Sequence, residues 1–172
     1  FYSHARNIEA MRLIQLESDL RLALERDEFF VVYQPQVDVL EGELVVAVEA
    51  LVRWHHPREG LVNPDTFIKV AESCGLIAAL DEQVLRKALQ GISQLNTSLK
   101  KPLTLNTNIS AAHFRQPDFV DQVRLMLAET GLAPHLLCLE ITESTLMREV
   151  GTAREHLSAL RALGVSVAVD DF

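Results

Sequence analysis

The sequence has 172 residues, of which 48% are hydrophobic and 23% are charged, as in an ordinary globular domain with one buried core. A formal net charge of −8 argues against a protein that coats DNA or RNA through its phosphates. No stretch approaches the ~20 apolar residues of a membrane span, and the N-terminus lacks a signal-peptide pattern. We therefore expect a cytoplasmic domain, in a protein that is itself cytosolic or is anchored to a membrane by another part.

The first elements predict a helix followed by a hairpin. Apolar residues recur at helical spacing over 8–26, and an amphipathic helix is expected there. A β-branched and aromatic strand follows over 29–38, and the next strand runs from about Glu43 to Trp54. The link around Glu41-Gly42 is far shorter than the dozen or so residues that a parallel crossover needs. These two strands must therefore be antiparallel.

Strands and helices alternate along the rest of the sequence. A loop is expected over 55–60, and Asn63 and Pro64 are a candidate N-cap and first helical residue. Helices are predicted over 64–75, 80–95, 117–130 and 150–163, with strands beginning at Leu103, Leu136 and Val165. Such alternation indicates right-handed parallel crossovers around one sheet, and the fold class is α/β, of the (β/α)8 TIM-barrel type.

Four of these strands end in an oxygen-bearing side chain: Glu49, Asn108, Glu140 and Asp170. Catalytic groups of a (β/α) barrel lie at the carboxyl ends of its strands, so we expect these side chains on one rim. An all-oxygen set suits Mg²⁺ or Mn²⁺ rather than zinc, and the adjacent Asp171 indicates two ions. Asn106 shares the parity of Asn108 and is expected to face the interior without touching metal.

Simpler interpretations of the same residues stay open. Glu49 and Arg53 share one face of a strand and could form a structural ion pair. Asp170 and Asp171 could be a solvated turn or a helix cap.

Several other residues receive structural roles only. Cys74 and Cys138 lack CxxC spacing and are expected to be buried small hydrophobic residues. His55 and His56 point apart as sequence neighbours, and a solvated or capping role is expected for them. The other histidines are scattered and receive no role. Trp54 is expected to pack in the core or at the rim rather than to stack on a base.

The sequence closely resembles the EAL domain family of cyclic di-GMP-specific phosphodiesterases, named after the motif Glu49-Ala50-Leu51. Other motifs of the family occur before and after it, in this order along the sequence: Tyr33-Gln34-Pro35, Val52-Arg53-Trp54, His56-Pro57, Phe67-Ile68, Ala71-Glu72, Gly75-Leu76-Ile77, Asn108-Ile109-Ser110, Leu139-Glu140-Ile141-Thr142-Glu143-Ser144 and Asp170-Asp171-Phe172. In this order the motifs are highly specific.

The resemblance implies a modified barrel with an antiparallel first strand, which cuts cyclic di-GMP to the linear dinucleotide with Mg²⁺ or Mn²⁺. The implied metal ligands and catalytic residues are Glu49, Asn108, Glu140, Asp170 and Asp171. Gln34, Leu51 and Arg53 would contact the substrate, Arg53 as a forked cation on a phosphate. Glu143 would steady the loop that follows Asp171-Phe172.

The resemblance also bears on domain organisation. We expect a linker helix over 1–28 and a partial EAL domain over 29–172 with its five N-terminal strands, because the sequence ends before the family's catalytic lysine and a downstream glutamate. Activity is therefore expected of the complete domain. The opening helix resembles the junction after a GGDEF domain, although a plain capping helix would look the same. An upstream GGDEF or sensory domain and a homodimer through the EAL domain are compatible with the resemblance.

Two other classes of function remain as alternatives. One is a non-catalytic module that binds cyclic di-GMP and signals through a partner. The other is a metal-dependent aldolase or lyase on a generic barrel, which would explain the rim oxygens but not the series of motifs.

Overall fold

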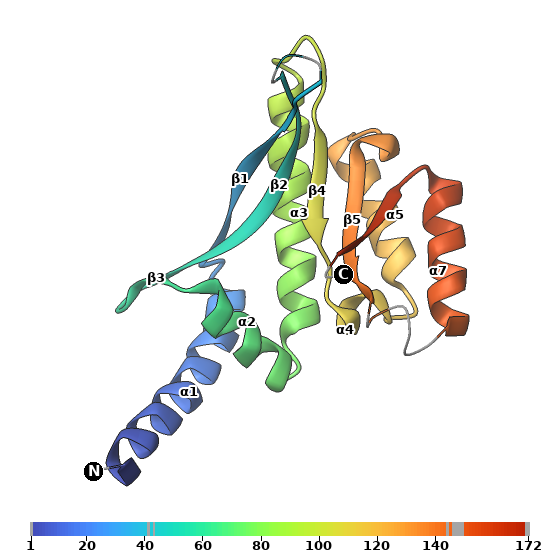
Figure 1. The fold of residues 1–172 in the computed structure, drawn as a ribbon. Coiled ribbons are helices and arrows are strands. Elements are labelled where there is room, and N and C mark those ends of the chain that lie inside the picture. Colours follow the sequence, from blue (N-terminus) through green and yellow to red (C-terminus); the bar gives the residue numbers. More distant parts are fainter. Residues whose placement is uncertain (1, 41, 43, 144, 146–149, 171–172) are drawn as a thin grey trace.

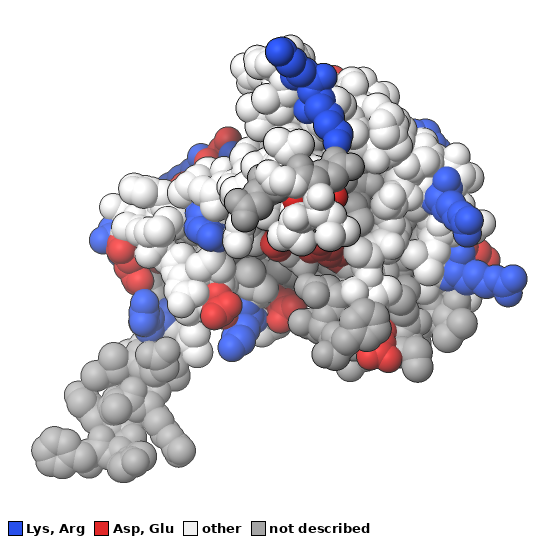
Figure 2. All heavy atoms as spheres, turned by 45° about the horizontal axis from the view of Figure 1, so that its top comes forward, with Lys and Arg blue, Asp and Glu red and all other residues white. Residues whose placement is uncertain are grey.

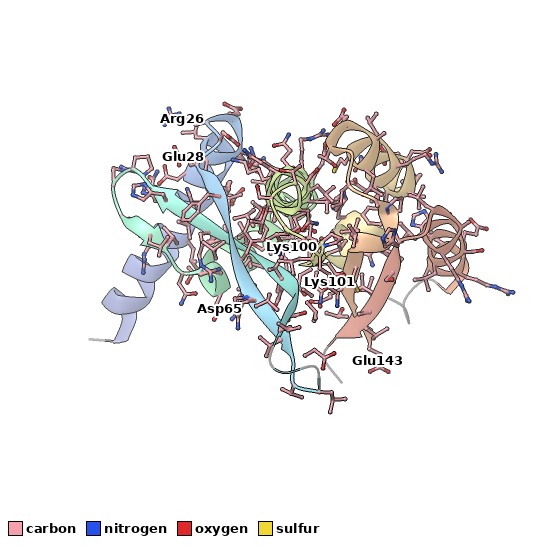
Figure 3. The ribbon with its side chains drawn as sticks, turned by 90° about the horizontal axis from the view of Figure 1, so that it is seen from above. Arg26, Glu28, Asp65, Lys100, Lys101 and Glu143 are labelled. Carbon is pink, nitrogen blue, oxygen red and sulfur yellow. The ribbon has the colours of Figure 1, made fainter. Side chains whose placement is uncertain are left out.

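The computed structural model describes residues 2–40, 42, 44–143, 145 and 150–170. In this part of the chain, one mixed sheet has six strands in the order β1-β2-β4-β5-β6, with the short β3 paired to β2. Helices α3, α5 and α7 lie along one face of this curved sheet, while α1 and α2 lie at the far end of β2 (Figures 1 and 3). The opposite face of the sheet carries no helix among the described residues.

The elements have the following bounds. The helices are α1 (Tyr2–Glu25), α2 (Pro64–Ser73), α3 (Ile77–Asn96), α4 (Ala111–Phe114), α5 (Phe119–Thr130) and α7 (Val150–Leu163), with a 3-10 turn, η1, at Pro134–Leu136. The strands are β1 (Phe29–Asp38), β2 (Leu44–His56), β3 (Gly60–Val62), β4 (Thr104–Asn108), β5 (Leu137–Thr142) and β6 (Ser166–Asp170).

The predicted topology is confirmed. β1 and β2 form an antiparallel hairpin whose register runs from Phe29 opposite Trp54 to Asp38 opposite Leu44, with one irregularity after Gln36. The pairs β2–β4, β4–β5 and β5–β6 are all parallel, with helices in each connection. The fold is α/β, as expected, with an antiparallel first strand.

The expected loop over 55–60 is instead a second hairpin. β2 continues to His56, and β3 folds back so that His56 lies opposite Gly60. The ring of His56 explains this turn, because its Nδ1 accepts hydrogen bonds from the backbone N–H groups of Arg58 and Glu59, at 3.1 and 3.0 Å. His56 is buried, so the capping half of its expected role is confirmed and the solvated half is wrong.

Helix ends follow the predicted signals. Asn63 caps α2 by accepting a hydrogen bond from the N–H of Asp65 at 3.0 Å, and Pro64 is the first helical residue. α5 ends at Gly131, whose φ of 69° lies in the left-handed region that glycine tolerates without strain. The short helix α4 was not predicted, because its four residues are too few to show a hydrophobic period.

Two clusters of buried side chains make up the core. The larger one lies between α3, α5, α7 and the strands, and the smaller one joins α1 and α2 to β2. Trp54 is the centre of the smaller cluster: its exposed fraction is 0%, and its ring packs against Phe29 and Phe67 with centroids 5.3 and 5.7 Å away. The predicted core role of Trp54 is thus confirmed.

Within the described ranges, no helix combines the length and the apolar character that crossing a bilayer requires.

Candidate functional site

Side chains alternate between the two faces of β4 and β5. Leu105, Thr107, Leu137, Leu139 and Ile141 are buried beneath the helices. The residues between them are less buried and belong to the helix-free face: Asn106, Asn108, Cys138, Glu140 and Thr142. Strand geometry alone therefore places the polar side chains of both strands on the same face.

Glu49, Asn108 and Glu140 come together on three neighbouring strands: Asn108 ends β4, Glu140 lies two residues before the end of β5, and Glu49 lies within β2, which continues to His56. The register places Glu49 opposite Asn106 and Asn108 opposite Glu140. The side-chain amide of Asn108 donates a hydrogen bond to Oε1 of Glu49, with 2.9 Å between nitrogen and oxygen. The three side chains lie close together as predicted, but Glu49 does not end its strand, because β2 continues for seven residues to pair with β3.

The alternative ion pair between Glu49 and Arg53 is not formed. Among the described contacts, Arg53 donates through Nη1 to the carbonyl oxygen of Val52 at 2.8 Å, and none joins it to Glu49. Arg53 instead lines a pocket beside the rim. This leaves Glu49 with a neutral partner, Asn108.

The last pair of predicted ligands lies partly outside the described residues. The backbone of Asp170 ends β6 and pairs with Thr142, but its side chain is not described, and Asp171 lies outside the described part altogether. No three described His, Cys, Asp or Glu side chains gather as a metal cluster. Asn108 is not of these residue types and the side chains of the two aspartates are not described, so the predicted metal set stays a prediction.

A pocket of about 270 Å³ opens next to the rim, between β2, α2, α3 and the ends of β4 and β5. Its walls include the apolar side chains Leu51, Ile68, Ile77 and Leu80. Its charged lining residues are Arg53, Glu72, Asp81 and Glu140. Apolar walls combined with polar and charged groups are typical of a site for a small organic ligand.

Asp81 is a pocket residue that the sequence analysis missed. Burial raises the pKa of its carboxyl, as does the negative charge of Glu72, while hydrogen bonds from Ser110 and the charge of His113 oppose the rise. The backbone N–H of Ser110 donates to Oδ2 of Asp81 at 2.8 Å. A signal was present, since Asp81 lies one helical turn from Ile77 and one from Leu85, both of which are buried.

The other predicted residues take the following places. Gln34 is exposed and lies opposite Glu49 in the β1–β2 register. Glu143 is exposed directly after β5 (Figure 3), and the loop it was expected to steady lies outside the described residues. Asn106 faces the interior as expected, and its amide donates to Oε1 of Gln36 at 2.9 Å.

Cys138 is not in the main core. It lies half-buried on the helix-free face, where burial, and then the charge of Glu140, raise the pKa of its thiol. Cys74 is half-buried too.

Figure 2 shows acidic side chains set back in the hollowed centre of one face, with most basic side chains farther out.

Comparison with known proteins decides the family. The family model of the EAL domain matches residues 17–172. The chain belongs to the EAL domain family. The match begins inside α1, whose residues Leu16, Leu20 and Ala23 are buried in the smaller core cluster. Whether residues 1–28 act as a linker stays a prediction.

Curated relatives in this family are long proteins. The cyclic di-GMP phosphodiesterase NbdA of Pseudomonas aeruginosa is 40% identical over 172 residues, which are 100% of this chain and 22% of NbdA. The bifunctional diguanylate cyclase/cyclic di-GMP phosphodiesterase MucR of the same species is 38% identical over 172 residues, 100% of this chain and 25% of MucR. The chain thus spans about a quarter of the length of these relatives.

Solved EAL structures have the same fold. The MucR phosphodiesterase in complex with cyclic di-GMP matches with a TM-score of 0.84 and 38% identity, over 92% of this chain and 64% of that one. The EAL enzyme Bd1971, in a form with cAMP and cyclic di-GMP bound, matches with a TM-score of 0.87 and 29% identity, over 98% of this chain and 47% of that one.

Proposed function

We propose that this EAL chain belongs to a phosphodiesterase that hydrolyses cyclic di-GMP to the linear dinucleotide with Mg²⁺ or Mn²⁺. The observation that carries the proposal is the meeting of Glu49, Asn108 and Glu140 at one rim, with the amide of Asn108 2.9 Å from Glu49. The phosphodiesterase names of NbdA and MucR support the substrate.

The donor set fits a hard divalent cation. Carboxylate oxygens of Glu49 and Glu140 and the amide oxygen of Asn108 are ligands that Mg²⁺ and Mn²⁺ prefer, and the absence of histidine from this set disfavours zinc. Asp170 and Asp171 are proposed to complete the site and to hold a second ion. Such ions make water a better nucleophile and offset the negative charge of a phosphodiester.

The protein's own groups position the substrate. Water attacks phosphorus, one P–O ester bond breaks, and the released sugar oxygen takes a proton. Arg53, in the pocket wall, is proposed to hold a phosphate through its forked guanidinium. Leu51 supplies an apolar surface for a base, and Gln34, opposite Glu49, is proposed to contact the ligand from β1.

The test is hydrolysis of cyclic di-GMP by the full-length protein that contains this chain, with Mg²⁺, with Mn²⁺ or with EDTA, following the linear product by chromatography. We expect metal-dependent turnover that Glu49→Gln lowers at least about 100-fold, since a metal ligand is lost. Far-UV circular dichroism checks that the variant folds. The matched control is Glu155→Gln on the exposed surface of α7, which should behave as the unmodified protein.

Two outcomes would contradict the proposal. Unchanged hydrolysis by Glu49→Gln would exclude Glu49 as a metal ligand. Tight binding of cyclic di-GMP without any turnover would support the non-catalytic binding module instead. Assembly with an upstream GGDEF or sensory domain, or with a second copy of the domain, stays a prediction; the bifunctional name of MucR supports the first.

A further inference from the structure

One side-chain hydrogen bond crosses a whole strand on the helix-free face of the sheet. The amide of Asn106, in β4, donates to Oε1 of Gln36, in β1, at 2.9 Å. β2 lies between these two strands, and its residue Ala47 is the register partner of Gln36. Ala47 is buried although no described helix covers its face, as expected beside a side-chain bridge that crosses β2 there. The contact between Asn106 and Gln36 is called the amide bridge below.

The amide bridge lies directly beneath residues of the candidate site. Side chains two positions apart in a strand share one face of the sheet. The next residue after Asn106 on this face of β4 is Asn108, and the residue beside Gln36 on this face of β1 is Gln34. Gln34 lies opposite Glu49 in the register, and Asn108 donates to Glu49. The bridge therefore joins the two strands that flank Glu49.

Backbone pairing alone does not fix how β1 stands relative to β4. The rotation between neighbouring strands of a sheet ranges from roughly −10 to −35°. Among the described strands, β1 has β2 as its single neighbour. The β1–β2 register is also interrupted directly after Gln36, and an irregularity of this kind bends a strand and increases its twist. The bridge thus holds β1 at the residue where its ladder is interrupted.

A second contact holds β1 from the opposite face. Oη of Tyr33 donates to the carbonyl oxygen of Ala88, in α3, at 3.0 Å. Tyr33 and Gln36 point to opposite faces, so the first residue joins β1 to the helix layer and the second joins it to β4. A strand that is held at one point can tilt about that point, whereas two contacts on opposite faces fix the tilt. Gln34 lies between these two contacts.

We propose that Gln36 and Asn106 are positioning residues for ligand binding, because their bridge fixes the place of Gln34 beside Glu49. The inference rests on the proposed function, in which Gln34 contacts the ligand. β4 is held between β2 and β5, so loss of the bridge moves β1 and leaves the pair of Glu49 and Asn108 in place. Contact with the substrate is therefore weakened, while the proposed metal ligands keep their arrangement.

The test is the steady-state kinetics of cyclic di-GMP hydrolysis by the full-length protein that contains this chain, with Mn²⁺. Gln36→Met and Asn106→Leu remove the bridge with side chains of similar size. We expect each to raise KM about 10-fold, with kcat and the Mn²⁺ concentration for half-maximal activity changed less than about two-fold. The double variant should be no worse than either single variant, because all three lack the same interaction.

Exchange of the two amides separates the bridge from a general loss of packing. Gln36→Asn combined with Asn106→Gln keeps a donor, an acceptor and the summed length of the two side chains, and should return KM to within about three-fold of the unmodified value.

The matched control is Asn96→Leu. The side chain of Asn96 accepts from the N–H of Leu103 at 2.9 Å and donates to its carbonyl oxygen at 3.0 Å, at the opposite end of β4 from Asn108. Its loss should lower the urea midpoint and leave KM unchanged, since a less stable protein has fewer active molecules but the same site.

Three results would overturn the inference: an unchanged KM in both Gln36→Met and Asn106→Leu, a loss confined to kcat, or a raised KM that the exchanged pair does not reverse. If Asn106→Leu does not fold, Gln36→Met, at a half-buried position, and the exchanged pair decide. Failure of the unmodified protein to hydrolyse cyclic di-GMP would contradict the proposed function. The Kd of cyclic di-GMP in EDTA then replaces KM, with the same expected rise of about 10-fold, and absence of binding would overturn this inference as well.

Discussion

Asp81 is a single residue whose burial costs stability when its carboxyl is ionised. Its pKa is raised above the ordinary 3.8 by burial, so the folded state binds more protons than the unfolded state at higher pH. The stability that comes from this proton is complete at pH values below 3.8 and is lost as the pH rises through the folded pKa. Stability should therefore fall with rising pH across this window.

We predict that Asp81→Asn flattens this dependence. The asparagine keeps an oxygen that accepts from the N–H of Ser110 but has no proton to lose. The free energy of unfolding of the variant should therefore increase relative to that of the unmodified protein as the pH rises. Urea unfolding at about pH 5 and about pH 8 measures the difference. A difference that shrinks with rising pH would show that Asp81 is not the responsible group.

Gly91 is a second single residue that affects stability, because a larger residue there would clash with Tyr33. A Cβ added there would lie 2.1 Å from Oη of Tyr33, which donates to the carbonyl oxygen of Ala88 at 3.0 Å. We predict that Gly91→Ala lowers the free energy of unfolding by about 1–3 kcal/mol, because overpacking outweighs the gain in helix propensity of about 1 kcal/mol.

Chemical denaturation measures this effect. Tyr33→Phe should restore part of the stability of Gly91→Ala, since the clashing oxygen is removed. Gly151→Ala in α7, where a new Cβ would meet nothing within 4 Å, is the matched control and should not destabilise. Equal stability of Gly91→Ala and Gly151→Ala would contradict the packing described for Tyr33.

At the scale of elements, Asp19 of α1 contacts two residues of the β2–β3 turn. Oδ2 of Asp19 lies 3.2 Å from Nε2 of His56 and 2.9 Å from Nη2 of Arg58. Burial opposes ionisation of Asp19, but hydrogen bonds from Gln15 and His56 and the charge of Arg58 outweigh it, so that its pKa is lowered. This carboxylate is therefore stabilising above its ordinary pKa of 3.8.

We predict that Asp19→Asn lowers the free energy of unfolding by about 1–2 kcal/mol at neutral pH. Because the folded pKa is lowered, the difference should vanish as the pH falls through that value. Urea unfolding at neutral and at acidic pH measures it. Glu17→Gln, which removes only the exposed pair with Arg21, should change stability very little. If Asp19→Asn lowered the free energy of unfolding equally at every pH, the charge of Asp19 would not be what stabilises the packing of α1.

At the scale of the whole molecule, β2 joins the two core clusters. Val48 and Ala50 belong to the larger cluster and Trp54 to the smaller, and Val31 of β1 contacts both. A strand that is shared in this way should transmit unfolding from one cluster to the other.

We therefore predict one cooperative transition. Trp54 is the only tryptophan, so its fluorescence reports on the smaller cluster, whereas far-UV circular dichroism reports on all helices. The two midpoints should coincide in urea. Val48→Ala should shift both midpoints equally, and separate midpoints would show that the clusters unfold independently.

The strands, most helices, the antiparallel hairpin and the EAL family can be predicted from the sequence, because they depend on local period, on turn chemistry and on ordered motifs. The parity of the strands also predicted that Glu49, Asn108 and Glu140 lie close together, but the end of the strand at Glu49 was wrong, because β2 continues to His56. The exceptions were short: β3 and α4 have too few residues to show a period.

Which side chains meet could not be predicted from the sequence. Asn108, 59 positions from Glu49 in sequence, is its partner, while Arg53, on the same face of the strand, is not. Asp81 and His113 face each other because α3 and the segment after β4 pack together. Local periodicity says which face a residue takes, whereas the partner across that face depends on register and helix packing, which are set by contacts between segments far apart in the chain.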